Sequence, residues 1–151
     1  MVFLEEKRDL FTVPEEYALV HCISADFALG AGIAVNFRNM GVKRELIETY
    51  NDSTKYGTYL NEWNVRKAGT CLLTTTGRPV FNLVTKARYF DKPTYGTLAQ
   101  SLVVMKEIYS PEKIAMPRIG CGLDRLEWEK VSVMIHTIFK DTDTEILVCY
   151  I

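Results

Sequence analysis

The fold of this chain is decided by one short stretch, Met116-Pro117-Arg118-Ile119-Gly120-Cys121-Gly122-Leu123-Asp124. An apolar run at residues 114–116 leads into it, and residues at helical spacing resume at 126–131. A strand that enters a glycine-containing loop and then a helix is a favourable setting for a phosphate site, because glycines let the backbone approach an anion and several N–H groups can point into one concavity. The pattern also fits an ordinary connection whose glycines only relieve a tight turn, so both interpretations stay open.

A second stretch repeats this order. Residues 17–24 are a mostly apolar run of strand length, which is typical of a strand buried on both faces. A loop with Gly30 and Gly32 follows, and a helical stretch begins at Ile33. Because ligands collect at the carboxyl ends of parallel strands, two such units in one small domain predict a binding cleft.

Length, composition and charge limit the classes of protein. A chain of 151 residues fits a single domain over 1–151 with a sizeable core. Its 18 basic and 19 acidic residues argue against general nucleic-acid binding but are compatible with a site for one small anion. Four cysteines without a CxxC pair, and only two histidines, argue against a zinc site. We therefore expect no metal and no cofactor, and we expect a monomer.

The N-terminus and the apolar runs bear on location. Charged residues begin at Glu5, too early for a signal peptide, and no apolar run reaches membrane-spanning length. We therefore expect an intracellular protein, in the cytoplasm or nucleus, with reduced thiols.

The remaining patterns predict the layers of the fold. Strands are expected from residue 2, at 70–75 and 80–85 as a hairpin, at 114–116 and at 145–151. Helices are expected at 33–38, at 42–50, from Thr94 to Tyr109 with Leu98, Leu102, Met105 and Ile108 on one face, and at 128–139. Residues 51–67, with Trp63, fit a loop or irregular excursion. Strands that alternate with helices, plus one hairpin, predict a three-layer α/β/α sandwich with a central mixed sheet.

A few polar residues are candidates for the cleft. Lys86 follows the second strand of the hairpin; most lysines are solvated, but a position at the end of a strand favours a place in the cleft more than for an average lysine. Asp124 follows the glycine loop, where it could instead cap a helix that begins near Leu126. Asp9 and Ser24 are compatible with simple turns. No triad or carboxylate pair can be assigned from spacing, so the residues themselves predict an α/β domain with a small-anion cleft and nothing finer.

Five segments of the chain resemble those of macrodomains, and most closely the branch containing terminal ADP-ribose protein glycohydrolase. They lie at residues 21–24, 30–34, 85–86, 92–95 and 116–126, in register over nearly the whole chain. The segment 51–66 is longer than in that branch, and Ala87 stands where a second basic residue can follow the lysine. The Asn-Ala-Ala-Asn and triple-glycine signatures of the commoner macrodomain hydrolases are absent from the sequence.

The resemblance implies that the ligand is ADP-ribose. Asp9 would hydrogen-bond the adenine, and the main chain of residues 118–123 would wrap the diphosphate, which needs oriented N–H dipoles rather than many arginines. The terminal Ile151 is a further expected contact. The other residues that the resemblance assigns to the substrate are Leu10, Ser24, Ala31, Gly32, Ile33, Thr85, Arg118, Ile119, Gly120, Cys121, Gly122 and Leu123.

The resemblance also implies a mechanism in which Lys86 attacks C1″ of the distal ribose and Asp124 is the general base. The reaction would remove ADP-ribose from glutamate or aspartate esters and deacylate O-acetyl-ADP-ribose. A lysine attacks only when uncharged, and because an ordinary lysine has a pKa of about 10.4 it needs a base or desolvation.

Two other functions remain compatible with this resemblance. One is a phosphatase that acts on ADP-ribose 1″-phosphate, and the other is a non-catalytic reader of ADP-ribose. A generic nucleotide-binding module is less well supported, because neither a Walker loop nor a dinucleotide fingerprint occurs.

Overall fold

The computed structural model describes residues 1–50 and 68–151. The predicted excursion at 51–67, including Trp63, lies outside the described residues. The strands are β1 (Val2–Lys7), β2 (Ala18–Ser24), β3 (Thr70–Thr74), β4 (Val80–Lys86), β5 (Lys113–Met116) and β6 (Glu145–Tyr150). The helices are α1 (Ala34–Asn39), α2 (Val42–Tyr50), α5 (Tyr95–Val104) and α6 (Trp128–Phe139), with a 3-10 turn η1 (Leu10–Thr12) and a π-helical turn η3 (Met105–Tyr109).

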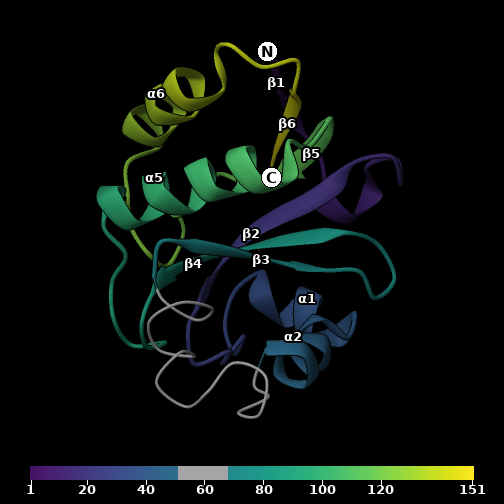
Figure 1. Ribbon diagram of the computed structural model, residues 1–151, viewed down its shortest axis with the longest axis vertical. Coiled ribbons are helices and arrows are strands. Elements are labelled where there is room, and N and C mark those ends of the chain that lie inside the picture. The colour runs from purple at the N-terminus through teal and green to yellow at the C-terminus, as the bar shows by residue number, and fades with distance from the viewer. Residues whose placement is uncertain (51–67) are drawn as a thin grey trace.

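The strands form one six-stranded sheet in the order β1-β6-β5-β2-β4-β3. All neighbouring pairs are parallel except the β3–β4 hairpin, so the sheet is mixed. Helices α1 and α2 cover one face, and α5 and α6 cover the other (Figure 1). The predicted three-layer α/β/α sandwich is therefore confirmed.

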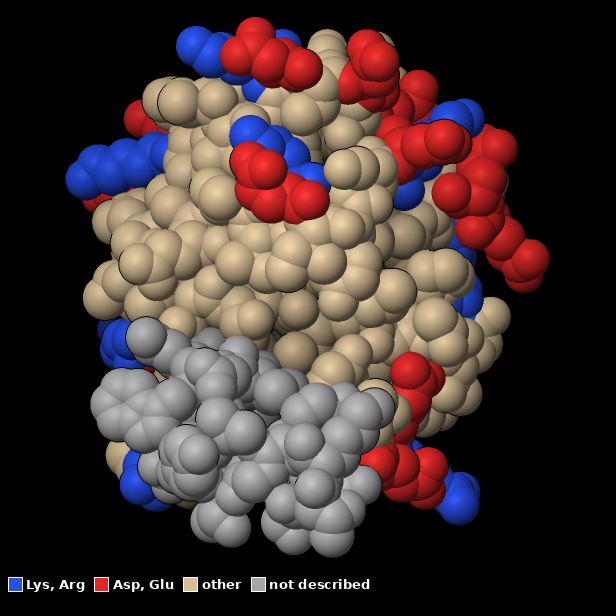
Figure 2. Space-filling model, in the orientation of Figure 1, with Lys and Arg blue, Asp and Glu red and all other residues tan. Residues whose placement is uncertain are grey.

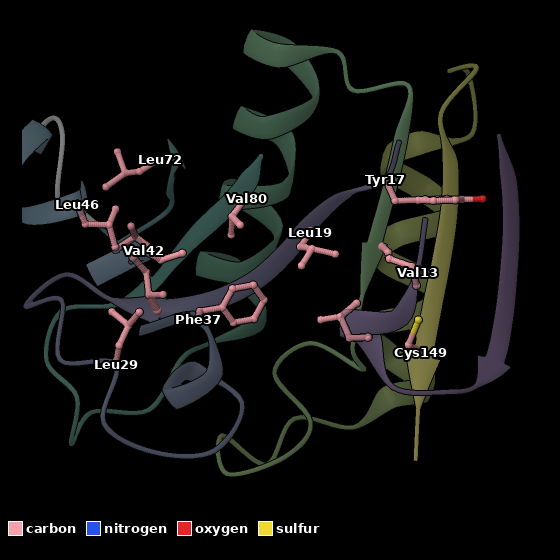
Figure 3. Packing of buried hydrophobic residues seen from close by; sticks show 14 of the residues in the cluster. Val13, Tyr17, Leu19, Leu29, Phe37, Val42, Leu46, Leu72, Val80 and Cys149 are labelled. Carbon is pink, nitrogen blue, oxygen red and sulfur yellow. The ribbon is translucent and has the colours of Figure 1, made fainter. Parts of the chain in front are cut away.

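Each face of the sheet has its own apolar core. On the first face, Phe37 of α1 and Val42 and Leu46 of α2 are fully buried against strand residues such as Leu19 and Val80 (Figure 3). A second cluster joins the other face to α5, η3 and α6; its fully buried members include Leu98, Leu102, Met105, Val131, Ile135 and Phe139. Because both faces of β2 are covered by helices, its residues are apolar on both sides, and this explains the continuous apolar run in the sequence.

The helix predicted from Thr94 to Tyr109 needs one correction. Thr94 does cap α5, and its side chain and that of Thr97 form a reciprocal capping box. The last turn, however, is π-helical, and Ile108, predicted to lie on the buried face, is 67% exposed. The wider turn changes which residues meet the sheet: Tyr109 packs on Phe81, with ring centroids 5.2 Å apart.

The surface seen in Figure 2 carries charges of both signs along its edges, and uncharged residues fill most of its centre. Among residues 1–50 and 68–151, no helix combines the length and apolar character needed to cross a membrane.

Candidate functional site

The site lies where the carboxyl ends of β2, β4 and β5 meet. The parallel pairing of β2 with β4 places Ser24 opposite Lys86, at a register shift in the ladder. On the other side of β2, β5 ends at Met116 and leads into the glycine loop. The two glycine loops and the end of the hairpin therefore converge at one edge of the sheet, as expected for a ligand cleft in an α/β fold.

Lys86 and Asp124 meet directly at this edge. Lys86 Nζ donates a hydrogen bond to Asp124 Oδ1 at 2.8 Å, and the two side chains are 15% and 17% exposed. Lys86 is the last residue of β4 rather than the first residue beyond it, so the strand itself positions the amine. Asp124 does not cap a helix, because α6 begins at Trp128 and Glu127 occupies the N-cap position.

The glycine loop has a defined conformation. Gly120 adopts φ +73°, which favours glycine, and its carbonyl accepts from Leu126 N at 2.7 Å. Lys92 Nζ donates to the carbonyl of Leu123 at 3.2 Å. Among the described residues, no acceptor receives the backbone N–H groups of Gly122 and Leu123. The loop thus presents N–H donors that an anion could accept.

A cavity of about 660 Å³ opens beside this loop. Among its lining residues are several that the resemblance assigns to the substrate, namely Asp9, Leu10, Ile33, Arg118, Cys121, Gly122 and the terminal Ile151. Sequence reasoning missed its other lining residues, which are Arg8, Phe11, Asn36, Pro117, Leu126, Trp128, Cys149 and Tyr150. They come from both ends of the chain, from α1, from the glycine loop after β5 and from the start of α6, so segments far apart in sequence meet at this cavity.

Other predicted substrate residues do not line this cavity. They are Ser24, Ala31, Gly32, Thr85, Ile119, Gly120 and Leu123, together with Lys86 and Asp124. Thr85 and Ile119 are buried, with 1% and 2% of their surface exposed, so the structure does not present either residue to a ligand. Gly32 lies against Leu123, since a Cβ on Gly32 would stand 3.3 Å from Leu123 Cδ1. Asp124 follows Gly122 by two residues, so the Cα atoms of these two residues lie within about 7 Å of each other.

The Arg118 side chain lies against the cavity wall. Its guanidinium carbon is 4.4 Å from the Tyr150 ring centroid and 5.9 Å from that of Trp128. Glu5 Oε1 lies 3.9 Å from Arg118 Nε and also accepts from Trp128 Nε1. The arginine is therefore held by aromatic rings and a carboxylate, and the prediction that residue 118 acts on the diphosphate mainly through its main chain fits this geometry.

Sequence reasoning also missed Asp26, which connects two loops of the site. Asp26 Oδ1 accepts from Ser24 Oγ and, at 3.2 Å, from Ala28 N, while Oδ2 accepts from Tyr89 N at 2.9 Å. An aspartate two residues beyond a strand end is typical of an Asx-turn, and that signal could have identified it.

Two cysteines near the site, Cys22 and Cys121, have thiols with raised pKa values. Burial, with Asp124 and Cys121 nearby, raises the pKa of Cys22 to about 12. Burial likewise raises the pKa of Cys121 to about 11, so its thiol stays protonated near neutral pH. The described part of the chain holds no group of three His, Cys, Asp or Glu residues that could bind a metal ion.

Comparisons with known proteins give both a family and a fold. No protein-family model matches the chain. The Homo sapiens protein named ADP-ribose glycohydrolase OARD1 is 42% identical over 146 residues, which cover 94% of this chain and 87% of that protein. The Bos taurus protein of the same name matches equally well. Uncharacterized protein 032R of Invertebrate iridescent virus 6 is 30% identical over 99 residues, 63% of this chain and 99% of that protein.

Solved structures agree on the fold. The macrodomain of Mycobacterium tuberculosis DarG has a TM-score of 0.74 and 20% identity, over 98% of this chain and 97% of that chain. Thermosipho africanus DarTG in complex with ADP-ribose has a TM-score of 0.70 and 14% identity, over 98% of this chain and 41% of that chain. At these identities the structures establish a shared architecture.

Proposed function

Since the chain belongs to the macrodomain family, in the branch of terminal ADP-ribose glycohydrolases, we propose that it hydrolyses ADP-ribose from glutamate or aspartate esters on proteins and deacylates O-acetyl-ADP-ribose. The coarser part of this function, an ADP-ribose glycohydrolase, rests on 42% identity over 94% of the chain. The linkage and the residues that carry the chemistry rest on the geometry of the site.

The cavity supports binding of the adenosine end of ADP-ribose. Its volume of about 660 Å³ is in the range of small-ligand sites. Asp9 is an exposed residue of the cavity lining. One of its carboxylate oxygens caps η1 by accepting from Phe11 N at 2.9 Å. The carboxylate retains further acceptor sites for an adenine amino group. Phe11 and Tyr150 supply apolar ring surface nearby.

The glycine loop supports binding of the diphosphate. Gly122 lines the cavity, and its N–H and that of Leu123 are the donors described above. Main-chain donors bind an anion without a cluster of basic side chains, which suits a chain of net charge -1. A diphosphate on these donors directs the distal ribose along the loop toward Asp124.

The contact of 2.8 Å between Lys86 Nζ and Asp124 Oδ1 is the observation that carries the catalytic proposal. In the first step, the ammonium passes a proton to Asp124 and the free amine attacks C1″. The C1″–O bond breaks, and the carboxylate of the modified protein leaves with the electron pair. Asp124 then gives the proton it received to the departing carboxylate. In the second step, the Asp124 carboxylate takes a proton from water, which attacks C1″; the C1″–N bond breaks, the amine leaves with the electron pair, and Asp124 returns the proton to Lys86.

Turnover and trapping test the proposal together. The protein is given a glutamate-ADP-ribosylated protein and, separately, O-acetyl-ADP-ribose, and release of ADP-ribose is measured. The lysyl adduct becomes an imine at C1″ when the C1″–O bond of the ribose ring opens, and borohydride added during turnover delivers hydride to that imine. The resulting stable amine is mapped by peptide mass spectrometry. We expect turnover of both substrates and an ADP-ribose adduct on Lys86.

Other outcomes would contradict this proposal or identify a different function. An adduct on another residue would refute the role of Lys86. Phosphate release from ADP-ribose 1″-phosphate, without turnover of the esters, would identify the phosphatase instead. Tight binding of ADP-ribose without turnover of any of these compounds would identify a reader.

A further inference from the structure

The loop that follows Lys86 exposes a pair of aromatic side chains at its tip. Tyr89 is 66% exposed and Phe90 is 64% exposed. Their ring centroids lie 5.3 Å apart at an interplanar angle of 88°, so the rings pack edge to face on each other. Single exposed apolar residues are common, but adjacent exposed aromatic rings beside a reactive site are typical of a recognition surface.

The tip is held in place rather than left to move freely. Tyr89 N donates to Asp26 Oδ2 at 2.9 Å, which ties the tip to the loop after β2. Within the loop, Arg88 N donates to Asp91 Oδ2 at 3.1 Å, and Asp91 N donates to the carbonyl of Arg88 at 3.0 Å. A surface fixed in this way loses little conformational entropy when a partner binds.

The position of the tip relative to the proposed chemistry indicates its partner. Tyr89 is three residues from Lys86, so the two Cα atoms lie within about 11 Å of each other. The adenosine end of the ligand is assigned to the far end of the cavity, beside Asp9. The group that leaves C1″ must lie on the side of Lys86 and Asp124, and in a modified protein that group is a carboxylate on a polypeptide.

We infer that Tyr89 and Phe90 are a docking surface for the polypeptide that carries the ADP-ribose. This inference rests on the proposed function, because it takes the orientation of the ligand from it. Aromatic side chains bury a large area at a small cost in rotamer freedom, so they suit a partner whose sequence varies. An acetyl group is too short to extend over the tip, so only polypeptide substrates use this surface.

Binding measurements test the inference without dependence on turnover. The background is Lys86→Ala, which prevents hydrolysis, and the ligands are free ADP-ribose and a peptide with ADP-ribose on one glutamate. We expect the peptide to bind about tenfold more tightly than free ADP-ribose. Adding Tyr89→Ala and Phe90→Ala removes that difference and leaves the affinity for free ADP-ribose unchanged. The matched control adds Ile108→Ala and Val133→Ala, which truncate side chains 67% and 66% exposed on η3 and α6 and keep the preference.

The outcomes separate this inference from the proposed function. Equal affinities for the two ligands in the Lys86→Ala background, or an equal loss for both on truncation of the tip, would overturn the docking surface. Absence of turnover in the wild-type protein would overturn the hydrolase, whereas a peptide preference abolished by the tip variants would still support the surface.

Discussion

Lys86 Nζ and Asp124 Oδ1 form a hydrogen bond of 2.8 Å across 38 residues of sequence. The amine is fixed by the pairing of β4 with β2, and the carboxylate is fixed by the loop after β5. With 15% and 17% of the side chains exposed, the pair is shielded but open to a ligand. Proton transfer between the two groups needs no rearrangement of the backbone.

The first prediction separates chemistry from binding. Lys86→Ala should lower kcat on the ester substrates by about 10³-fold or more, and Asp124→Asn by about 10²- to 10⁴-fold, since each removes a group that acts on the reacting atoms. Affinity for ADP-ribose, measured by calorimetry, should change only a few-fold in either variant. Lys113→Ala, which breaks the exposed ion pair with Glu16, is the matched control and should retain full kcat. Wild-type kcat in Lys86→Ala would contradict the mechanism.

The glycine loop gives a second prediction, in which two glycines behave differently. Gly120 has φ +73°, and a Cβ there would lie 2.9 Å from Leu126 Cδ1, so Gly120→Ala should reduce the free energy of unfolding by about 1–2 kcal/mol. A Cβ on Gly122 would meet nothing within 4 Å, and Gly122→Ala should unfold like the wild type. Because Gly122 lines the cavity, however, the added methyl should keep a ligand from the backbone and weaken ADP-ribose binding roughly tenfold. Denaturant titration and calorimetry measure the two effects, and equal stability of the two variants would argue against the assigned loop conformation.

Much of the fold could be predicted because its signals are local. The run at 17–24 and the hairpin around Gly77 are strands in the structure, and Thr94 caps α5 as predicted. The meeting of Lys86 with Asp124 was expected only from the resemblance to macrodomains. Strand order, which decides that meeting, is a property of long-range pairing that spacing does not reveal.

The misses have two causes, a local change of helical period and contacts between segments far apart in sequence. Ile108 was assigned to a buried face because an α-helical period was assumed, and the π-helical turn changes that period. The contacts of Arg118 with Tyr150 and Glu5 join β1, β6 and the glycine loop, which are far apart in sequence. The position of Asp26 after β2 predicts an Asx-turn, but its second contact, with Tyr89 N, joins segments that the sequence does not show to be neighbours.

Glu45 gives a third prediction, on stability at acid pH. Burial alone would raise its pKa, but hydrogen bonds from the Thr76 hydroxyl and from the backbone N–H groups of Thr75 and Thr76 outweigh burial and hold the pKa below the ordinary 4.5. The ionised Glu45 carboxylate therefore contributes its full stabilisation of the folded protein above pH 4.5. This contribution is lost as the pH falls through the lower pKa that Glu45 has in the folded state.

Denaturant unfolding at pH values from 7 to below 4.5 measures the contribution of Glu45 to the free energy of unfolding. Glu45→Gln should be less stable than the wild type at pH 7, and the difference should shrink as the pH falls below the ordinary glutamate pKa of 4.5. Glu48→Gln, on the same helix with an exposed ion pair to Arg44, is the control and should differ little from the wild type at any pH. A difference for Glu45→Gln that grows on acidification would contradict the assignment.

His21 gives the last prediction, over a range that begins at higher pH. The ring is fully buried, stacks on Phe37 with centroids 3.8 Å apart, and has Nε2 at 2.6 Å from Asn82 Oδ1. Because the Asn82 amide nitrogen donates to the carbonyl of Leu72, Oδ1 is the acceptor and Nε2 carries the hydrogen. Burial lowers the pKa of His21 to about 4, although the bond to Asn82 opposes this effect. The folded protein thus holds the ring neutral at pH values where the unfolded chain protonates it.

Stability should therefore decline as the pH falls from about 6.5, the ordinary histidine pKa, and the decline from this group should end near the folded value of about 4. Over that interval the loss corresponds to about 3 kcal/mol. His21→Gln removes the titrating ring, so its free energy of unfolding should be lower at pH 7 but should vary less between pH 6.5 and pH 4 than that of the wild type. His136→Gln, which changes an exposed histidine on α6, should keep the wild-type slope. An identical slope in His21→Gln and wild type would show that the buried ring is not the origin of the acid sensitivity.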